Sequence, residues 1–188
     1  MALEGKTVLI REERDEDMQF LVDLRNDLDT QGFTKSLPTD YTLPMYRKRF
    51  EAAEFSYERD SARFILEDKA SGERAGLISY YGHHSRLSVV IGIVVSKQYW
   101  GTGLAFNAQE TLLEFLFEEL GVRVVRIFTN SGNPAAMGLA ERSGFKVCSR
   151  LREAVFRRGG LYDNLNMELL REEFYDRRSD LTDNLPKI

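Results

Sequence analysis

Two glycines form the part of this chain whose spacing most clearly predicts a binding site. Gly101 and Gly103 follow the β-branched run 87–95 and precede a stretch, 104–120, with apolar residues at helical spacing. A glycine loop at a helix N-terminus presents backbone N–H groups and the positive end of the helix dipole. The spacing therefore predicts a site for a phosphorylated ligand, although paired glycines also occur in packing turns. A dinucleotide motif would need a third glycine at Phe106, and the Lys of a nucleotide P-loop is absent.

Few other side chains have the chemistry to act on a substrate. His83 and His84 are neighbours at the end of an expected strand, so they point to opposite faces and cannot bind one metal ion together. Tyr162 follows an expected hairpin turn, where a packing role is the alternative. Cys148 is the single cysteine and is expected to be a small buried side chain. Metal sites use several Cys or His residues at short spacing, so no metal site is expected.

These residues need a sheet and helices to position them. Alternating and β-branched segments predict strands over 7–11, 63–67, 75–81, 87–95, 122–129, 145–156 and 161–170. Helical spacing predicts helices from Asp17, over 45–57, over 104–120 and after Asn133. The segment 87–129 reads as strand, glycine loop, helix and strand, so its two strands are expected to be parallel or splayed. We expect one domain over 1–172 and a charged tail, 173–188, that frays.

The composition excludes several classes of protein. The chain has 188 residues, a net charge of −4 and 43% hydrophobic residues, as in one globular domain. Its longest apolar run, Val89–Val95, is far shorter than the roughly 20 residues that cross a bilayer, so no membrane partner is expected. No secretion signal follows the N-terminus, and the single cysteine suits a reducing cytoplasm. The slightly acidic balance predicts no nucleic-acid partner.

Two motifs at a specific spacing carry a resemblance. One is Gln98-Tyr99-Trp100-Gly101-Thr102-Gly103-Leu104-Ala105, and the other runs from Asn133-Pro134-Ala135-Ala136 to Glu141-Arg142-Ser143-Gly144-Phe145. From Thr7 to Leu170 the chain resembles the GNAT superfamily of acetyl-CoA-dependent N-acetyltransferases. Within it, the chain is most similar to the branch of ribosomal-protein N-terminal and spermidine acetyltransferases. The resemblance implies an α/β fold: a mixed, mostly antiparallel central sheet of six to seven strands, about four helices and a splayed strand pair.

The resemblance also implies where acetyl-CoA binds. In this family the pyrophosphate is held by loop amides, which correspond to Trp100, Gly101, Thr102, Gly103, Leu104 and Ala105. The main chain of Ile93, Val94 and Val95 would pair with the pantetheine arm like an added strand, because freed strand groups need partners. Asn133 corresponds to an asparagine that contacts the cofactor, and it equally suits a helix N-cap.

The family's usual catalytic positions carry no catalytic side chain here. Val90 stands where a glutamate base is common, Ala140 where a tyrosine acid is common, and Ala136 where a polar residue is common. The catalytic residues are therefore unknown, and two hypotheses remain. In an enzyme that works by proximity, a weakly basic amine that is appreciably neutral at pH 7.5 would attack acetyl-CoA directly in a ternary complex. The alternative is a non-catalytic acetyl-CoA sensor or interaction module.

The acceptor is expected to be a small-molecule amine or a peptide N-terminus. By resemblance, His83, His84 and Tyr162 lie on the acceptor side, with surface or packing roles as alternatives. The acidic stretch 12–29 favours a cationic acceptor, whereas Arg157 and Arg158 favour one that also carries a carboxylate or phosphate. The sequence leaves both open. A homodimer is expected from the resemblance alone.

Overall fold

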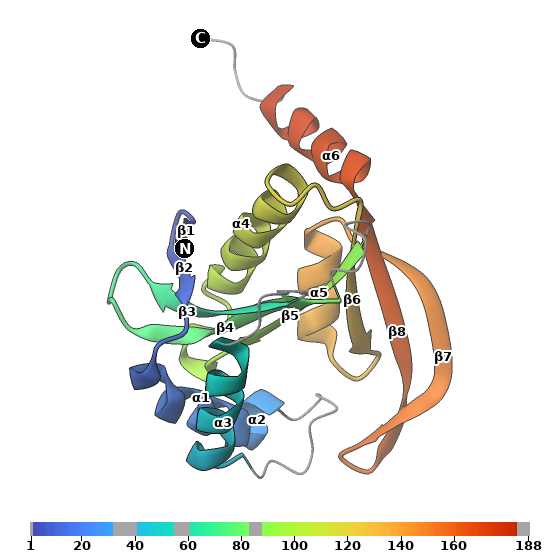
Figure 1. Ribbon diagram of the computed structural model, residues 1–188. Helices are drawn as coiled ribbons and strands as arrows, with labels where there is room; N and C mark the ends of the chain where they lie inside the picture. The colour runs from blue at the N-terminus through green and yellow to red at the C-terminus, as the bar shows by residue number, and fades with distance from the viewer. Residues whose placement is uncertain (1, 32–40, 55–60, 83–87, 184–188) are drawn as a thin grey trace.

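The structure is a computed structural model that describes residues 2–31, 41–54, 61–82 and 88–183 (Figure 1). Within these residues one sheet has the strand order β1-β2-β3-β4-β5-β6-β8-β7. The strands are β1 (Ala2–Glu4), β2 (Val8–Glu12), β3 (Ala62–Asp68), β4 (Arg74–Tyr81), β5 (Ser88–Val95), β6 (Val124–Asn130), β7 (Lys146–Arg157) and β8 (Gly160–Leu170).

Helices pack on both faces of this sheet (Figure 1). They are α1 (Met18–Asn26), α2 (Leu28–Gln31), α3 (Leu43–Glu54), α4 (Leu104–Glu118), α5 (Pro134–Arg142) and α6 (Arg171–Asp183), with short 3₁₀ turns η1 (Asp15–Asp17) and η2 (Lys97–Tyr99). On one face, α4 buries Leu112, Leu113 and Leu116 in the main core. On the other, α1 and α3 cover a smaller core around Leu77 of β4. No helix of the described segments is long and apolar enough to cross a membrane.

The predicted splayed strand pair is confirmed. β5 and β6 form the only parallel pairing among the described strands, and it runs only from Ser88↔Val124 to Val90↔Arg126. Beyond that point β5 continues to Val95 beside β4, and β6 continues to Asn130 beside β8. Every other pairing in the sheet is antiparallel. The two strands therefore separate after Val90, which is the vertex of the splay.

The expectation of six to seven strands and about four helices was too low. The structure adds β1, which pairs with β2 through a turn closed by the Gly5 N–H to the Val8 carbonyl at 2.8 Å. A strand of three residues is too short to show alternation in a sequence. The predicted strands and helices otherwise appear, and the additional helices are α2, of four residues, and α6.

The prediction of a frayed tail from residue 173 is wrong as far as Asp183. α6 spans Arg171–Asp183, and Phe174 is fully buried with its ring centroid 5.0 Å from that of Phe117. Arg177 also pairs with Glu110 of α4 at 2.6 Å. The segment is so highly charged that its one deeply buried aromatic gives no periodic signal. Residues 184–188 lie outside the described part of the chain.

Strand β7 forms an exposed edge of the sheet. Its residues from Lys146 to Ala154 are all exposed, and Val147 and Leu151 are 51% and 56% exposed. Cys148 is exposed as well, and its thiol donates to the Asn166 carbonyl at 3.3 Å. The expectation of a buried cysteine was wrong because Cys148 lies on the edge strand of the sheet, at an irregularity in the β7–β8 register between Val147 and Ser149.

Candidate functional site

The glycine loop between β5 and α4 has a backbone that requires its glycines. Gly101 and Gly103 have φ angles of +75° and +86°, in the left-handed region. A side chain at either position would meet nothing within 4 Å, so the loop faces open space. Two hydrogen bonds fix it from within: the Trp100 indole N–H donates to the Val95 carbonyl at 2.9 Å, and the Thr102 hydroxyl donates to the Tyr99 carbonyl at 2.8 Å.

The N-terminus of α4 is left available to an anion. Gly103 is the N-cap residue and has no side chain to cap the helix, and the first turn contains no acidic residue. The first N–H groups of a helix have no acceptor within the helix, and they lie at the positive end of its dipole. In this chain the Leu104 N–H donates to the Thr102 hydroxyl at 3.3 Å, and the other donors of the first turn of this 15-residue helix lie beside the loop.

Arg142 of α5 places a cation beside the same turn of α4. Its guanidinium carbon lies 4.1 Å from the ring centroid of Phe106, a cation–π contact. Within the described residues it forms no hydrogen bond or ion pair, so its charge is not neutralised by a carboxylate. In the sequence, Arg142 is visible only as part of the motif that runs from Asn133 to Phe145. The available sequence signal was an arginine followed by Ser-Gly at a helix end.

The predicted pantetheine segment has a free main-chain edge. From Ile91 to Val95, β5 pairs with β4 on one side and, among the described strands, with none on the other. Ile93 and Val94 are partly exposed, and Val95 is buried. The groups on this edge therefore need partners, and an extended amide-bearing ligand supplies them.

Asn133 has the predicted N-cap geometry and retains free donors. Its side-chain oxygen accepts the Ala136 N–H at 3.1 Å, with Pro134 in the first turn of α5. The side-chain amide N–H groups form no hydrogen bond within the described residues. A helix cap and a ligand contact are therefore compatible at this residue.

The family's base and acid positions remain apolar in three dimensions. Ala140 is fully buried in the main core, and Val90 lies at the vertex of the splay. The nearest polar side chains on the sheet come from the two neighbouring strands: Val90 is paired with Tyr81 of β4 on one side and with Arg126 of β6 on the other. Arg126 in turn lies 3.6 Å from Glu168 of β8.

Of the predicted acceptor-side residues, the structure describes Tyr162. Its ring packs against Gly132, where an added Cβ would lie 2.7 Å from it. The next residue, Asp163, exchanges hydrogen bonds with Ser131 and accepts the Glu153 N–H. This N–H, followed by the Arg150 guanidinium, lowers the pKa of Asp163. The pair thus joins the hairpin to the loop before Asn133. His83 and His84 lie outside the described residues.

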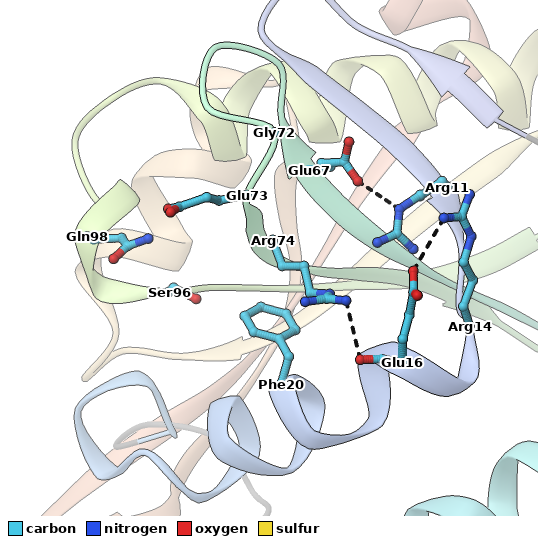
Figure 2. Close-up of a pocket in the computed structure, with 10 residues that line it drawn as sticks. All are labelled: Arg11, Arg14, Glu16, Phe20, Glu67, Gly72, Glu73, Arg74, Ser96 and Gln98. Carbon is cyan, nitrogen blue, oxygen red and sulfur yellow. Dashed lines mark hydrogen bonds and ion pairs between the residues drawn. The ribbon is translucent and has the colours of Figure 1, made fainter.

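A separate cavity of about 610 Å³ lies between β2, α1 and the start of β4 (Figure 2). The charged side chains that line it have partners. Arg14 pairs with Glu16, and Glu73 accepts a hydrogen bond from the Tyr99 hydroxyl at 3.4 Å. Asp17 beside it is fully buried and accepts two hydrogen bonds from Arg11, at 2.8 and 3.0 Å, and one from Arg74 at 2.6 Å. Arg11 also donates to Glu67 at 2.8 Å. This network joins β2, β3, β4 and η1, so we assign it to stability.

Three comparisons place these features among known proteins. The chain matches the GNAT acetyltransferase domain over residues 7–146. It is 30% identical over 126 residues to the SPbeta prophage-derived uncharacterized N-acetyltransferase YokL of Bacillus subtilis, covering 66% of this chain and 70% of that protein. It is 24% identical to the spermidine N(1)-acetyltransferase of Escherichia coli over 119 residues, covering 63% of each chain.

The solved structures agree on the fold. Spermidine N-acetyltransferase from Vibrio cholerae, crystallised with CoA and spermine, superposes with a TM-score of 0.82 at 20% identity. The match covers 91% of this chain and 99% of that one. An acetyltransferase of the same family from Bacillus anthracis superposes with a TM-score of 0.76 at 17% identity, covering 92% and 99%.

Proposed function

Because this chain belongs to the GNAT acetyltransferase family and its acetyl donor is acetyl-CoA, we propose that it acetylates a weakly basic primary amine by direct attack in a ternary complex. The carrying observation is the splay of β5 and β6 next to the glycine loop. The free edge of β5 suits the pantetheine arm, at Ile93, Val94 and Val95. The loop amides and the α4 N-terminus suit the pyrophosphate, and Asn133 and Arg142 lie on the adjacent helix.

The proposed acceptor follows from the missing base. Nothing at Val90 or Ala140 takes a proton from an ammonium group, so the amine has to arrive neutral. An amine with a pKa near 8 is appreciably neutral at pH 7.5, whereas one near 10.4 is neutral in about one molecule in a thousand. Small amines such as amino sugars, and peptide N-termini, meet this requirement. The spermidine enzymes among the relatives make a polyamine the second candidate acceptor.

Three further features belong to the proposal. The exposed edge β7, with apolar Val147 and Leu151, supports a homodimer. A cytoplasmic location is supported by the single thiol, which has no second cysteine to pair with. A sensor that binds acetyl-CoA without turnover is the alternative function, and the apolar catalytic positions favour it.

Release of CoA thiol from acetyl-CoA tests the proposal. The acceptors are alaninamide, glucosamine, an aminoglycoside and spermidine, with CoA binding followed by calorimetry. We expect turnover with at least one weakly basic amine and a lower kcat/KM with spermidine near pH 7.5. Tight CoA binding without turnover would favour the sensor. Turnover confined to spermidine would contradict the acceptor argument, and no binding of CoA would contradict the site itself.

A further inference from the structure

Within the described residues, one half of a sheet face beside the splay is partly exposed. Leu77 of β4 and Val94 of β5 pack in the smaller core under α1 and α3. Since side chains alternate along a strand, Tyr81 and Val90 lie on that same face but further along the strands. Arg126, Phe128 and Glu168 continue it across β6 and β8. Tyr81 and Phe128 are each 46% exposed. We therefore use the name open face for the set Tyr81, Val90, Arg126, Phe128 and Glu168.

The opposite face is closed at the same place. Val89 and Ile91 point into the main core, where Ala140 of α5 is fully buried. A ligand along the β5 edge therefore meets packed helices on one side and the open face on the other. An acceptor amine would therefore reach the thioester of such a ligand from the open face.

The length of the free edge places the thioester. The edge runs from Val95, next to the glycine loop, back to Val90, where β6 closes it. Five residues at about 3.3 Å each give about 16 Å, which suits an extended pantetheine arm. With the pyrophosphate on the loop, the sulfur end of that arm reaches the region of Gly92 and the vertex at Val90.

Tyr81 is the polar side chain of β4 at that vertex. It stands directly opposite Val90, and cross-strand neighbours have Cβ atoms about 5 Å apart. Its phenol forms no hydrogen bond within the described residues. Burial raises the pKa of Tyr81, so the phenol stays neutral in the range where enzymes work. Arg126, across the vertex, is paired with Glu168, which leaves no free carboxylate among the open-face residues.

We propose that Tyr81 binds the acceptor, its hydroxyl oxygen accepting an N–H of an uncharged amine beside the thioester carbonyl. This deepens the proposed function and rests on it. The nitrogen lone pair forms the C–N bond, and the C–S bond breaks with its electron pair on sulfur. One proton leaves nitrogen to water, and one proton from water reaches the thiolate. A neutral phenol has no negative charge to pair with an ammonium ion, and it favours uncharged amines, so Tyr81 sets the acceptor class.

Calorimetric titration of the protein–CoA complex with alaninamide or glucosamine tests the role without turnover. We expect Tyr81→Phe to weaken amine binding about tenfold, the loss of one hydrogen bond, and to leave the CoA Kd within twofold. Tyr175→Phe, on the remote helix α6, is the matched control and should change neither value. Val90→Glu places a carboxylate opposite Tyr81 and should raise spermidine affinity relative to alaninamide at least tenfold.

The outcomes separate the two claims. Amine binding unchanged by Tyr81→Phe, or no wild-type binding of either amine to the CoA complex, would overturn the role of Tyr81. Loss of CoA binding by the wild type would instead overturn the proposed function. Where turnover is measurable, the acceptor KM should rise in Tyr81→Phe while the KM for acetyl-CoA stays constant, and a change in the acetyl-CoA KM alone would contradict the assignment.

Discussion

The Arg142 guanidinium is oriented by an aromatic ring and not by a carboxylate. Phe106 holds it 4.1 Å from the ring centroid, and Phe106 is in the first turn of the helix that follows the glycine loop. A salt bridge would have fixed the side chain and cancelled its charge. Stacking fixes it and leaves its N–H donors available for phosphate.

Arg142→Gln should therefore weaken CoA binding about tenfold, as expected for the loss of one charged hydrogen bond of roughly 1.5 kcal/mol. Calorimetry with CoA and with dephospho-CoA measures this, and the comparison tells which phosphate is contacted. Arg123→Gln, which removes an equally exposed arginine before β6, is the control. Equal small losses in the two variants would mean that only the net charge matters.

At the scale of elements, the buried carboxylate of Asp17 joins parts of the chain that are far apart in sequence. Arg11 comes from β2, Arg74 from β4 and the third donor from the Arg14 backbone. Burial raises the pKa of Asp17, but the hydrogen bonds from Arg11, Arg74 and Arg14 outweigh it and lower that pKa to about 2. The fold thus depends on this group being ionised.

Asp17→Asn should lower the free energy of unfolding by about 3 kcal/mol, because it leaves two guanidinium groups without their buried partner. Urea unfolding at pH 7 measures the change. Glu16→Gln, which alters an exposed pair with Arg14, should cost less than about 1 kcal/mol. Similar losses in the two variants would contradict the assignment of the network to stability.

The pH dependence of this stabilisation has a definite sign. The folded-state pKa of Asp17 is lower than its unfolded value, so the contribution is complete above about pH 5 and is lost as the pH falls toward 2. Lowering the pKa of Asp17 from its usual value near 4 to about 2 corresponds to about 2–3 kcal/mol. The difference in unfolding free energy between wild type and Asp17→Asn should therefore shrink between pH 5 and pH 3. A constant difference would contradict it.

The buried side chain of Phe174 on helix α6 stabilises the fold. Phe174 is fully buried and contacts Phe117 of α4. Phe174→Ala should cost about 3–5 kcal/mol of unfolding free energy, as for other buried aromatics. Thermal or urea unfolding measures it against Phe156→Ala on β7, a 63% exposed phenylalanine whose loss should cost little. A small effect of Phe174→Ala on the free energy of unfolding would instead support the prediction of a frayed tail.

At the scale of the whole molecule, the splay leaves the edge of β5 from Ile91 to Val95 without a partner among the described strands. A ligand that binds only the folded state adds RT ln(1 + [L]/Kd), about 2.7 kcal/mol at a hundred times Kd. For a chain of this size that should raise Tm by about 5–10 °C. A thermal melt with and without CoA checks this. Adenosine alone should give a smaller shift, and equal shifts would mean that the β5 edge is not used.

How far the sequence predicted this molecule depends on the range of the interaction. The glycine loop and the N-cap at Asn133 follow from local spacing, and the structure has both. Spacing left the two strands of 87–129 parallel or splayed, and the family resemblance implied the splay that the structure has. The contact of Arg142 with Phe106 joins residues far apart in sequence, and the pairing of Tyr81 with Val90 depends on the register of two consecutive strands. Hydrophobic periodicity does not predict such pairs, so the residues of the acceptor side could be identified only from the strand register in the structure.

The exposed thiol on β7 affects how the enzyme has to be assayed. Thiol reagents that detect free CoA also react with Cys148, which contributes one equivalent per chain. A rapid signal of that size, without acceptor, would imitate a single-turnover burst or an acetylated intermediate. Cys148→Ser should abolish this signal and leave steady-state turnover unchanged. The absorbance change in the first seconds therefore comes from the protein thiol, and only the later steady-state rate measures acetyl transfer.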